Sequence, residues 1–389
     1  MHYGSYRYTR ATIDLDNITY NYNKMKDLLS SETKFMGVIK ADAYGHGAVE
    51  VGRHLEKQNI DFLAVAVLDE AMELREAGIK SSILLLSPIE PETIPLAIQN
   101  NISITVFSKD IAEQVRLEAE RLQMKAKVHF KIDSGMGRVG VRSREEALEV
   151  IQKMASEWVH FEGVFTHFAE AENTDDPSYT EYQYRFFMDI VNYLKEQNIY
   201  FELTHCSNTA ATLLYPEYHL DMIRTGISLF GYHPDKKLNQ LIDLKPVMKL
   251  STHAAYVKHV EKGQTIGYGR TYEAPEEKSI ATIVIGYADG IPRELSNRWY
   301  LTTQTHKANI VGRICMDQLM VDVSDIPEFS EETELVFIGD PAKGYPSIYK
   351  MAELTDSFHY EILCGIGKRI PRVYYKDDKV QSNYNALLN

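Results

Sequence analysis

The chain has 389 residues, of which 44% are hydrophobic and 25% charged, a composition typical of a folded protein of roughly two to three domains. Its 55 acidic residues outnumber its 42 basic residues by 13, which disfavours a nucleic-acid partner because phosphate binding needs a concentrated positive surface. No apolar run approaches the ~20 residues of a membrane-spanning helix, and the polar start carries no apolar signal segment, so we expect a cytoplasmic protein without membrane association.

Short apolar runs alternate with amphipathic segments of helical period from Asp14 onward. The runs predict eight strands: Lys34–Ile39, Phe62–Leu68, Ile83–Leu86, Ile102–Phe107, Lys127–Asp133, Phe161–Thr166, Tyr200–His205 and Asp221–Leu229. The segments between them predict helices at Val49–Lys57, Asp69–Glu76, Lys109–Arg121, Arg144–Met154 and Thr180–Glu196. Eight such units favour an α/β fold in which residues 12–238 form a (β/α)8 TIM-like barrel that binds a cofactor.

The pattern changes after about Leu238, where strands follow one another without long helices between them. We predict a separate, mainly-β C-terminal domain over residues 239–389, to which residues 1–11 also belong. Its predicted strands are Thr282–Gly286, Asn309–Val323 and Leu335–Ile338, its predicted helical segments are Tyr349–Leu354 and Glu361–Cys364, and Tyr6–Ile13 could add a further strand. Cys206, Cys315 and Cys364 are too few and too scattered for a disulfide framework or a zinc site, so we expect reduced thiols and no metal.

The chemistry of such a barrel is expected at the C-terminal ends of its strands. The first strand ends in Lys40, which precedes a glycine-rich turn and is a candidate Schiff-base former, although a surface lysine would fit the same pattern. The fifth strand runs into Lys131–Gly140, which contains the letters G-x-G-x-x-G. We reject a dinucleotide site there, because the glycines follow the fifth strand rather than the first and no acidic residue follows at the required place.

The seventh and eighth strands are followed by segments that suit an anion. Asn208 and Thr209 stand at a helix start after His205, and Arg224 precedes Gly226. Barrels often bind phosphate with these two loops through backbone N–H groups, whereas ordinary helix capping would explain the same residues. A lysine on the first strand with a phosphate cradle across the mouth matches the needs of pyridoxal 5′-phosphate, which takes an amine at its aldehyde.

Several strings in the sequence resemble the alanine racemase family, in the right order from about Ala11 to Arg372. They are VIKADAYGHG (Val38–Gly47), KIDSGMGRVG (Lys131–Gly140), THF (Thr166–Phe168), HCSNTAA (His205–Ala211), RTGIS (Arg224–Ser228), GYGRTY (Gly267–Tyr272), IGYADG (Ile285–Gly290), VGRICMDQ (Val311–Gln318) and HYEI (His359–Ile362). The resemblance implies pyridoxal-phosphate-dependent interconversion of L-alanine and D-alanine, supplying D-alanine for peptidoglycan.

By this resemblance Lys40 holds the cofactor covalently and acts as one acid/base, and Tyr268 acts as the other from the opposite face. Racemisation needs two such groups, because a proton removed from one face of Cα must return on the other. The resemblance places His205 in a hydrogen bond with Tyr268, supported by Arg224, which also donates to the pyridine nitrogen. A guanidinium does not give up its proton, so the ring nitrogen should stay unprotonated, which restrains side reactions.

The resemblance assigns the remaining site residues as well. His167 lies against the cofactor ring, Arg138 donates to its ring hydroxyl and also lies in the substrate site, and Lys131 matches a lysine that is carbamylated in several members. The phosphate ligands map to Tyr44, Thr209 with its neighbour Asn208, Gly226, Ile227 and Tyr360. Met316 and Asp317 map to the segment near the substrate carboxylate that the second subunit supplies, so a homodimer with shared active sites is implied. Positions matching the access corridor hold Glu172, Arg293, Arg313 and Phe358.

Departures from the family pattern remove no reacting group: Thr209 stands where serine is usual, Thr225 replaces a common proline, and Gly267 stands where serine is frequent. Three alternatives remain open. A serine or broad-specificity racemase would share the same chemistry. An amino-acid decarboxylase of the same fold lacks the GYG tyrosine context. A non-catalytic single-barrel protein that binds pyridoxal phosphate lacks the C-terminal β domain.

Overall fold

The structure, a computed structural model, describes residues 6–388 of the chain. Contacts divide the chain into two compact units. The barrel unit comprises Thr19–Ala43 and Ala48–Leu244. The β-rich unit comprises the described residues up to Ile18, the short segment Tyr44–Gly47, and the described residues from Lys245 onward. The segment Tyr44–Gly47, four residues after Lys40, therefore belongs to the β-rich unit, which the sequence pattern did not predict.

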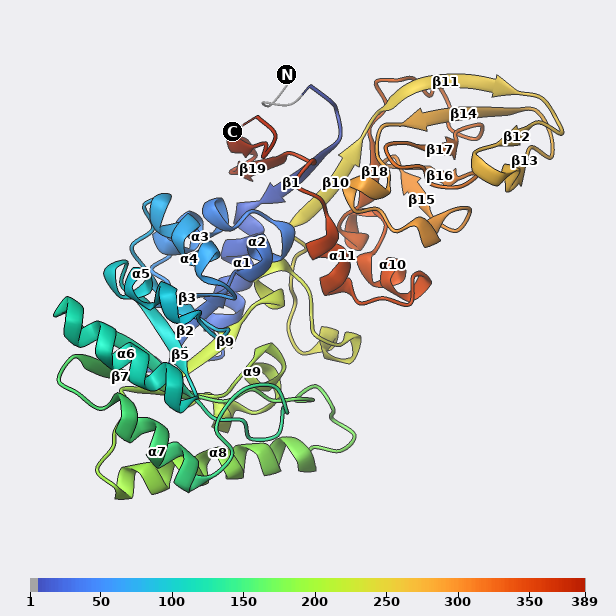
Figure 1. The fold of residues 1–389 in the computed structure, drawn as a ribbon. Helices are drawn as coiled ribbons and strands as arrows, with labels where there is room; N and C mark the ends of the chain where they lie inside the picture. The colour runs from blue at the N-terminus through green and yellow to red at the C-terminus, as the bar shows by residue number, and fades with distance from the viewer. Residues whose placement is uncertain (1–5, 389) are drawn as a thin grey trace. The chain divides into compact units, whose positions relative to one another are not determined.

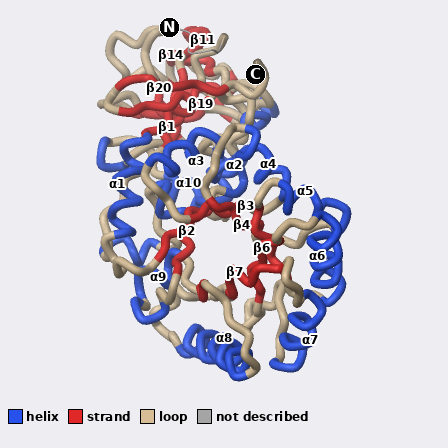
Figure 2. Tube along the Cα trace, turned by 90° about the vertical axis from the view of Figure 1, so that its left-hand side faces the viewer, coloured by secondary structure: helices blue, strands red, loops and turns tan. Residues whose placement is uncertain are grey.

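Eight parallel strands form the barrel, hydrogen-bonded in the order β8, β7, β6, β5, β4, β3, β2, β9. Their bounds are β2 Lys34–Val38, β3 Phe62–Val65, β4 Ser82–Leu85, β5 Ile102–Val106, β6 Ala126–Lys131, β7 Val159–Phe165, β8 Leu203–His205 and β9 Met222–Thr225. A backbone hydrogen bond runs from Asp221 N, just before β9, to Thr204 O in β8 (3.1 Å), and another runs from Arg224 N in β9 to Ser207 O, just after β8 (2.9 Å). Figure 2 looks into this ring of strands, with helices around its outside. The predicted TIM-like barrel and its eight strands are confirmed.

The strands of the barrel read as short, nearly continuous apolar runs because helices cover their outer face and side chains fill their inner face. All four residues of Phe62–Val65 are buried, for example. The helices of this part of the chain are α1 Leu15–Lys26, α2 Lys40–Gly45, α3 Ala48–Lys57, α4 Leu68–Glu76, α5 Ile94–Gln99, α6 Lys109–Leu122, α7 Arg144–Met154, α8 Ser178–Glu196 and α9 Thr209–Leu214. Ser108 and Ser143 cap α6 and α7 by accepting hydrogen bonds from the N–H groups three residues on. Short 3-10 turns lie at Pro91–Thr93, Pro216–Tyr218, Ile227–Phe230 and Lys236–Gln240.

The β-rich unit contains a ten-stranded sheet with the order β11, β14, β17, β16, β15, β18, β10, β1, β19, β20, and a small ribbon of β12 and β13. The strands, several labelled in Figure 1, are β1 Arg10–Asp14, β10 Met248–Thr252, β11 Ala254–Val260, β12 Thr265–Ile266, β13 Tyr272–Glu273, β14 Lys278–Ile283, β15 Tyr300–Thr302, β16 Lys307–Ile310, β17 Leu319–Asp322, β18 Leu335–Ile338, β19 Arg372–Lys376 and β20 Lys379–Tyr384. Two helices, α10 Ile348–Leu354 and α11 His359–Gly365, accompany 3-10 turns at Tyr268–Arg270, Tyr287–Asp289, Arg293–Leu295 and Pro341–Lys343. The predicted separate β-rich region is confirmed.

Two predicted strands of this sheet can be compared with the structure. The predicted N-terminal strand is present as β1, which pairs antiparallel with β10 and parallel with β19. The prediction of one long strand over Asn309–Val323 is wrong, because β16 ends at Ile310 and β17 begins at Leu319. The intervening residues turn away from the ladder and carry Met316 and Asp317. Apolar content alone could not reveal this interruption, since Val311 and Ile314 in the loop are buried too.

Within residues 6–388, no helix is long and apolar enough to cross a membrane. Cys206, Cys315 and Cys364 form no disulfide among these described residues, and Cys206 is buried. No group of three or more histidine, cysteine, aspartate or glutamate side chains in the same described range is arranged to hold a metal ion.

Candidate active site

Polar side chains gather at the C-terminal ends of the barrel strands, where the sequence predicted the chemistry. Lys40 follows β2, Lys131 ends β6, His167 follows β7, His205 ends β8, and Arg224 lies in β9. Because the strands are parallel, their C-terminal ends lie at one end of the barrel. The barrel unit therefore brings these five predicted residues to one mouth.

The short segment α2, which forms the turn after Lys40, has a left-handed backbone at four residues that are not glycine. Ala41, Asp42, Ala43 and Tyr44 have φ angles of 52°, 54°, 53° and 54°, a conformation that costs each non-glycine residue about 1–2 kcal/mol. Side-chain carboxylates hold this turn in the barrel unit. Ala41 N donates to Glu70 Oε1 at 2.6 Å, and Ala48 N donates to Asp42 Oδ1 at 2.8 Å. These hydrogen bonds hold the strained backbone in place directly after Lys40, at the end of β2.

The carboxylate of Glu70 joins the Lys40 turn to the neighbouring strand, because its second oxygen accepts from Ala66 N at 2.7 Å. Sequence reasoning did not single out Glu70. The signal available for it was its place three residues after Val67 at the start of α4, a position from which a glutamate reaches back to the backbone.

The end of the same turn belongs to the β-rich unit and is held there by Arg372. Gly45 has a φ of +80°, and a Cβ on it would collide with the carbonyl of Leu363. The guanidinium of Arg372 donates to Gly45 O through Nε at 3.1 Å and through Nη2 at 3.0 Å. Arg372 is buried and was also missed by sequence reasoning, since nothing local distinguishes it from a surface cation.

Tyr44 and Tyr360, the two predicted phosphate ligands of the β-rich unit, pack against each other. Their ring centroids lie 5.8 Å apart in an edge-to-face arrangement, and Tyr360 also stacks on Phe358 at 4.5 Å. Burial, with a smaller contribution from Cys364, raises the pKa of Tyr44 far above its ordinary value. The Tyr44 phenol therefore keeps its proton and can act as a hydrogen-bond donor to an anion.

The segment Lys131–Gly140 forms a compact loop at the end of β6. The carboxylate of Asp133 accepts from Gly135 N at 3.1 Å and from Gly137 N at 3.0 Å. Val141 N donates back to Lys131 O at 3.1 Å, and a Cβ on Gly140 would collide with Asp133 N. The glycines thus serve a tight loop that presents Arg138, in line with the rejection of a dinucleotide site.

Lys131 is a buried amine without a hydrogen bond among the described residues. Its Nζ lies 4.5 Å from the centroid of the Phe165 ring. Burial first, and then the charges of Arg224 and Arg138, lower its pKa well below the ordinary value, while Asp133 opposes this. A lysine in this environment favours the neutral amine, which is the nucleophilic form.

Arg224 is held by four groups at the mouth. Nη1 lies 2.9 Å from His205 Nδ1, and Nη2 donates to Thr166 O at 2.7 Å and to Cys206 O at 3.1 Å. Nη2 also lies 3.4 Å from His167 Nδ1. Burial lowers the pKa of Arg224 to about 10, so the guanidinium stays charged at neutral pH. Among the described residues nothing engages Nε, whose N–H remains available for an acceptor outside the chain.

The predicted hydrogen bond between His205 and Tyr268 is not compatible with this arrangement. His205 is fully buried, with Nδ1 against Arg224 and Nε2 at 2.9 Å from His129 Nδ1, so neither ring nitrogen is left for a phenol. The sequence could not reveal this, because His129 and His205 are brought together only by the closure of the barrel.

His167 also lies at the barrel mouth, and one of its ring nitrogens makes no hydrogen bond within the described residues. Its Nδ1 faces Arg224, whereas no residue of the described chain contacts Nε2 by a hydrogen bond. Burial first, and then Arg224, Lys131, Arg138 and Lys40, lower the pKa of His167 well below its ordinary value. A neutral ring whose Nδ1 accepts from a guanidinium carries its proton on Nε2, which makes Nε2 a donor.

The predicted phosphate loops follow β8 and β9. Asn208 caps α9, because its Oδ1 accepts from Ala211 N at 2.9 Å, and buried Thr209 has its hydroxyl 3.5 Å from that of Ser228. Ile227 begins the 3-10 turn after Gly226. The first N–H groups of each helical turn have no acceptor within the turn, so this end of the barrel offers donors to an anion. The Asn208 side chain therefore caps α9, which is one of the two roles that the sequence allowed for this residue.

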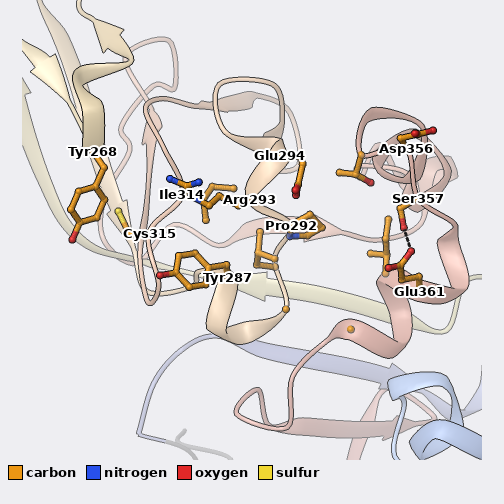
Figure 3. Close-up of a pocket in the computed structure, with 15 residues that line it drawn as sticks. Tyr268, Tyr287, Pro292, Arg293, Glu294, Ile314, Cys315, Asp356, Ser357 and Glu361 are labelled. Atoms are coloured by element: carbon orange, nitrogen blue, oxygen red, sulfur yellow. Dashed lines mark hydrogen bonds between the residues drawn. The ribbon is translucent and has the colours of Figure 1, made fainter.

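Tyr268 begins a 3-10 turn of the β-rich unit and stands between Gly267 and Gly269, whose φ angles are 75° and 71°. A small apolar core of Val260, Ile266, Ala274, Ile280, Val311 and Met320 lies beside this turn in the same unit. The Tyr268 side chain is 68% exposed and lines an open cavity of about 790 Å³ with Tyr287, Arg293 and Cys315. Figure 3 shows its ring extending free of the neighbouring side chains. An exposed phenol on a well-supported turn is available to a second component.

Met316 and Asp317 occupy the loop between β16 and β17 in the same unit. Tyr287 N donates to Cys315 O at 3.1 Å, and Ala288 N donates to Met316 O at 3.0 Å, which fixes this loop against the turn at Tyr287–Asp289. The Asp317 carboxylate pairs with Arg369 at 2.9 Å. The Met316 side chain is exposed, and its neighbour Cys315 lines the same cavity as Tyr268.

Comparisons with known proteins cover nearly the whole chain. Residues 13–234 match the family described as alanine racemase, N-terminal domain, and residues 247–374 match alanine racemase, C-terminal domain. The chain is 45% identical to alanine racemase 2 of Oceanobacillus iheyensis over 99% of this chain and 97% of that one. Among solved structures, it is similar to alanine racemase of Clostridium difficile 630 (38% identity, TM-score 0.92, 97% and 98% covered). It is also similar to alanine racemase of Bacillus anthracis with bound L-Ala-P (35% identity, TM-score 0.92, 98% of each chain covered).

Proposed function

The chain belongs to the alanine racemase family, and we propose that it interconverts L-alanine and D-alanine with pyridoxal 5′-phosphate, supplying D-alanine for peptidoglycan. The observation that carries this proposal is the gathering of Lys40, His167 and Arg224 at the C-terminal ends of β2, β7 and β9. These groups are an amine, a neutral imidazole and a guanidinium with one free N–H, and they lie at the end of the barrel that also offers donors to an anion.

The residues at the mouth fit the cofactor. The amine of Lys40 would hold it covalently, the free Nε–H of Arg224 would donate to its ring nitrogen, and the turns at Thr209 and Ile227 would bind its phosphate. The family resemblance assigns Tyr44 and Tyr360 as two further phosphate ligands. When bound, pyridoxal 5′-phosphate makes the Cα proton of an amino acid acidic by delocalising the electron pair that the proton leaves behind.

Two groups of this chain would move the proton. Lys40 Nζ removes it from, or returns it to, one face of Cα, and Tyr268 Oη serves the other face, since Cα becomes planar when the proton is absent. The phenol needs a donor to stabilise its deprotonated state. His167 Nε2, rather than the fully engaged His205, is the ring nitrogen suited to that role.

Arg224 would limit side reactions. A guanidinium at the ring nitrogen donates a hydrogen bond but does not transfer its proton, so the ring withdraws electrons less strongly. A weaker withdrawal favours return of the proton to Cα over its transfer elsewhere. The hydrogen bonds of Arg224 to two backbone carbonyls and to His205 would keep its Nε directed outward.

The proposed activity is tested by incubating the purified protein, loaded with pyridoxal 5′-phosphate, with L-alanine or with L-serine and separating the products by chiral chromatography. We expect alanine to reach equal amounts of both enantiomers well before serine does. Faster conversion of serine would identify a serine racemase, and release of carbon dioxide without inversion would identify a decarboxylase. No conversion of either amino acid would overturn the proposal.

We further predict that Lys131 is carbamylated. Its buried amine has no hydrogen-bond partner in the described chain, and the two guanidinium groups that lower its pKa would be balanced by a negative carbamate. Protein equilibrated with ¹³C-bicarbonate is expected to show one carbamate carbon signal per chain by NMR. The signal should vanish in Lys131→Met and persist in Lys127→Met, a lysine on the same strand; a wild-type protein without the signal would refute the carbamate.

We also predict an active site shared between two subunits, with Lys40 from one chain and Tyr268 from the other. It is supported by the exposed position of Tyr268 on a unit separate from the barrel, which a two-fold interface could bring to the neighbouring mouth. Inactive Lys40→Ala and Tyr268→Phe homodimers are dissociated and reassociated together. Random pairing places both lesions in one site of each mixed dimer, so about a quarter of all sites should recover. If both residues came from the same chain, mixing would restore no activity.

A further inference from the structure

A chain of buried polar side chains continues from the active-site mouth into the interior of the barrel. His205, which contacts Arg224 through Nδ1, lies with Nε2 at 2.9 Å from His129 Nδ1. His129 Nε2 lies 3.0 Å from Glu162 Oε2, and the same oxygen accepts from the hydroxyl of Ser103. None of these four side chains belongs to a residue more than 5% exposed. The chain thus links a carboxylate in the barrel core to the guanidinium at the mouth.

The hydrogen bonds in this chain have only one consistent direction. A guanidinium can only donate, so His205 Nδ1 accepts and its Nε2 carries the proton. His205 Nε2–H then donates to His129 Nδ1, and His129 Nε2–H donates to the carboxylate. Burial is the largest influence on both rings and lowers the pKa of each, and this keeps both histidines neutral. Burial alone would raise the pKa of Glu162, but the hydrogen bond and electrostatic attraction of His129, the hydrogen bond from Ser103 and the charge of Lys127 together outweigh it and lower the pKa to about 2.

The backbone makes room for this chain at Gly163. A Cβ at this position would collide with the ring of His129, so glycine leaves room for the ring beside β7. The pairing of β6 with β7 also shifts register between Val128 and His129, opposite the same glycine. These two features place the His129 ring between His205 and Glu162.

A buried carboxylate is costly to desolvate and is retained in a protein interior only when it is fully paired. Glu162 is separated from Arg224 by two imidazole rings, so it touches none of the groups assigned to the reaction. Its partners account for both of its oxygens, with Lys127 Nζ 3.6 Å from Oε1. Glu162 can influence the active-site mouth by setting which nitrogen of the His129 and His205 rings carries the proton.

We propose that Glu162 is a positioning residue that acts through His129 and His205 to fix the orientation of Arg224. This inference deepens the proposed racemase function and rests on it. Without the carboxylate, His129 is free to adopt the other tautomer and to direct Nδ1–H at His205. His205 would then present Nδ1–H to the Arg224 guanidinium, two donors would face each other, and Arg224 would lose one of the contacts that hold it.

The variant that tests this is Glu162→Gln, which keeps the size of the side chain but removes its charge and lets an N–H group face His129. Glu202→Gln is the matched control, because Glu202 also pairs with a histidine of β7, His160 at 2.7 Å, but on the exposed surface of the same barrel. We expect kcat for alanine racemisation to fall roughly 10- to 100-fold in Glu162→Gln, as for other supporting hydrogen-bond partners, with KM changed less than about threefold. Glu202→Gln is expected to match the wild type.

The second measurement does not depend on catalytic activity. Protein labelled with ¹⁵N-histidine is compared by NMR with and without pyridoxal phosphate, with signals assigned through His129→Asn and His205→Asn. We expect both rings of the wild type to be neutral and protonated on Nε2, and Glu162→Gln to change the tautomer signals of both. A charged ring or an Nδ1–H ring in the wild type would overturn the proposal, as would a Glu162→Gln protein with unchanged kcat. If the tautomers are as expected but the protein racemises no amino acid, the proposed function fails while the hydrogen-bond chain stands.

Discussion

Replacing Lys40 with alanine is expected to abolish racemisation of alanine, because it removes in one step the attachment point of the cofactor and one of the two groups that move the proton. Positioned acid–base catalysis alone is worth about 10²- to 10⁴-fold, so the combined loss should exceed ~10⁴-fold. The measurement is the rate of D-alanine formation by chiral chromatography, together with the peptide that carries the cofactor after borohydride reduction.

The matched control for this variant is Lys34→Ala, which changes the exposed lysine at the opposite end of the same strand. We expect it to retain activity and the labelled peptide to contain Lys40. Label on Lys131, the other amine at the barrel mouth, would show that the cofactor attaches elsewhere. A Lys40→Ala protein with wild-type turnover would remove the basis of the proposed chemistry.

Replacing Tyr268 with phenylalanine is expected to stop proton transfer on one face of Cα and leave the other face active. Racemisation should fall about 10²- to 10⁴-fold, while the cofactor stays bound, because the assigned cofactor contacts lie at the barrel mouth and at Tyr44 and Tyr360. In deuterated water, one enantiomer of alanine should still exchange its Cα hydrogen through Lys40 without inverting. The other enantiomer should exchange slowly.

Tyr256→Phe serves as the control, since Tyr256 is an exposed tyrosine on β11 of the same unit. It should behave as the wild type in both measurements. If Tyr268→Phe exchanged and inverted both enantiomers at the wild-type rate, another group would have to be the second base.

Much of the site could be predicted because it depends on local features. The eight strands follow from apolar runs bounded by turns, and Lys40, Lys131 and His205 could be placed at one mouth because each stands at the end of such a run. Tyr268 was found only through the resemblance of its GYG context, since nothing in its spacing from the barrel strands relates it to Lys40.

Other features depend on residues that are distant in the sequence. Asn309–Val323 was predicted as one strand because both of its halves and part of its middle are apolar, and only the pairing of β16 and β17 with their neighbours shows where the chain turns. The left-handed turn after Lys40 was not predicted either. Its non-glycine residues argue against that backbone, which is held by carboxylates such as Glu70.

The barrel, the separate β-rich region and the identity of the groups at the strand ends follow from local sequence, because hydrophobic period and strand-end position are properties of neighbouring residues. Which group each of these residues contacts depends on how distant segments pack together. His205 was expected to bond Tyr268, and instead its Nδ1 lies 2.9 Å from Arg224 at the mouth and its Nε2 lies 2.9 Å from His129 in the barrel interior. The position of a histidine in the sequence does not show which groups its two ring nitrogens contact. Those contacts depend on the side chains that folding places around the ring.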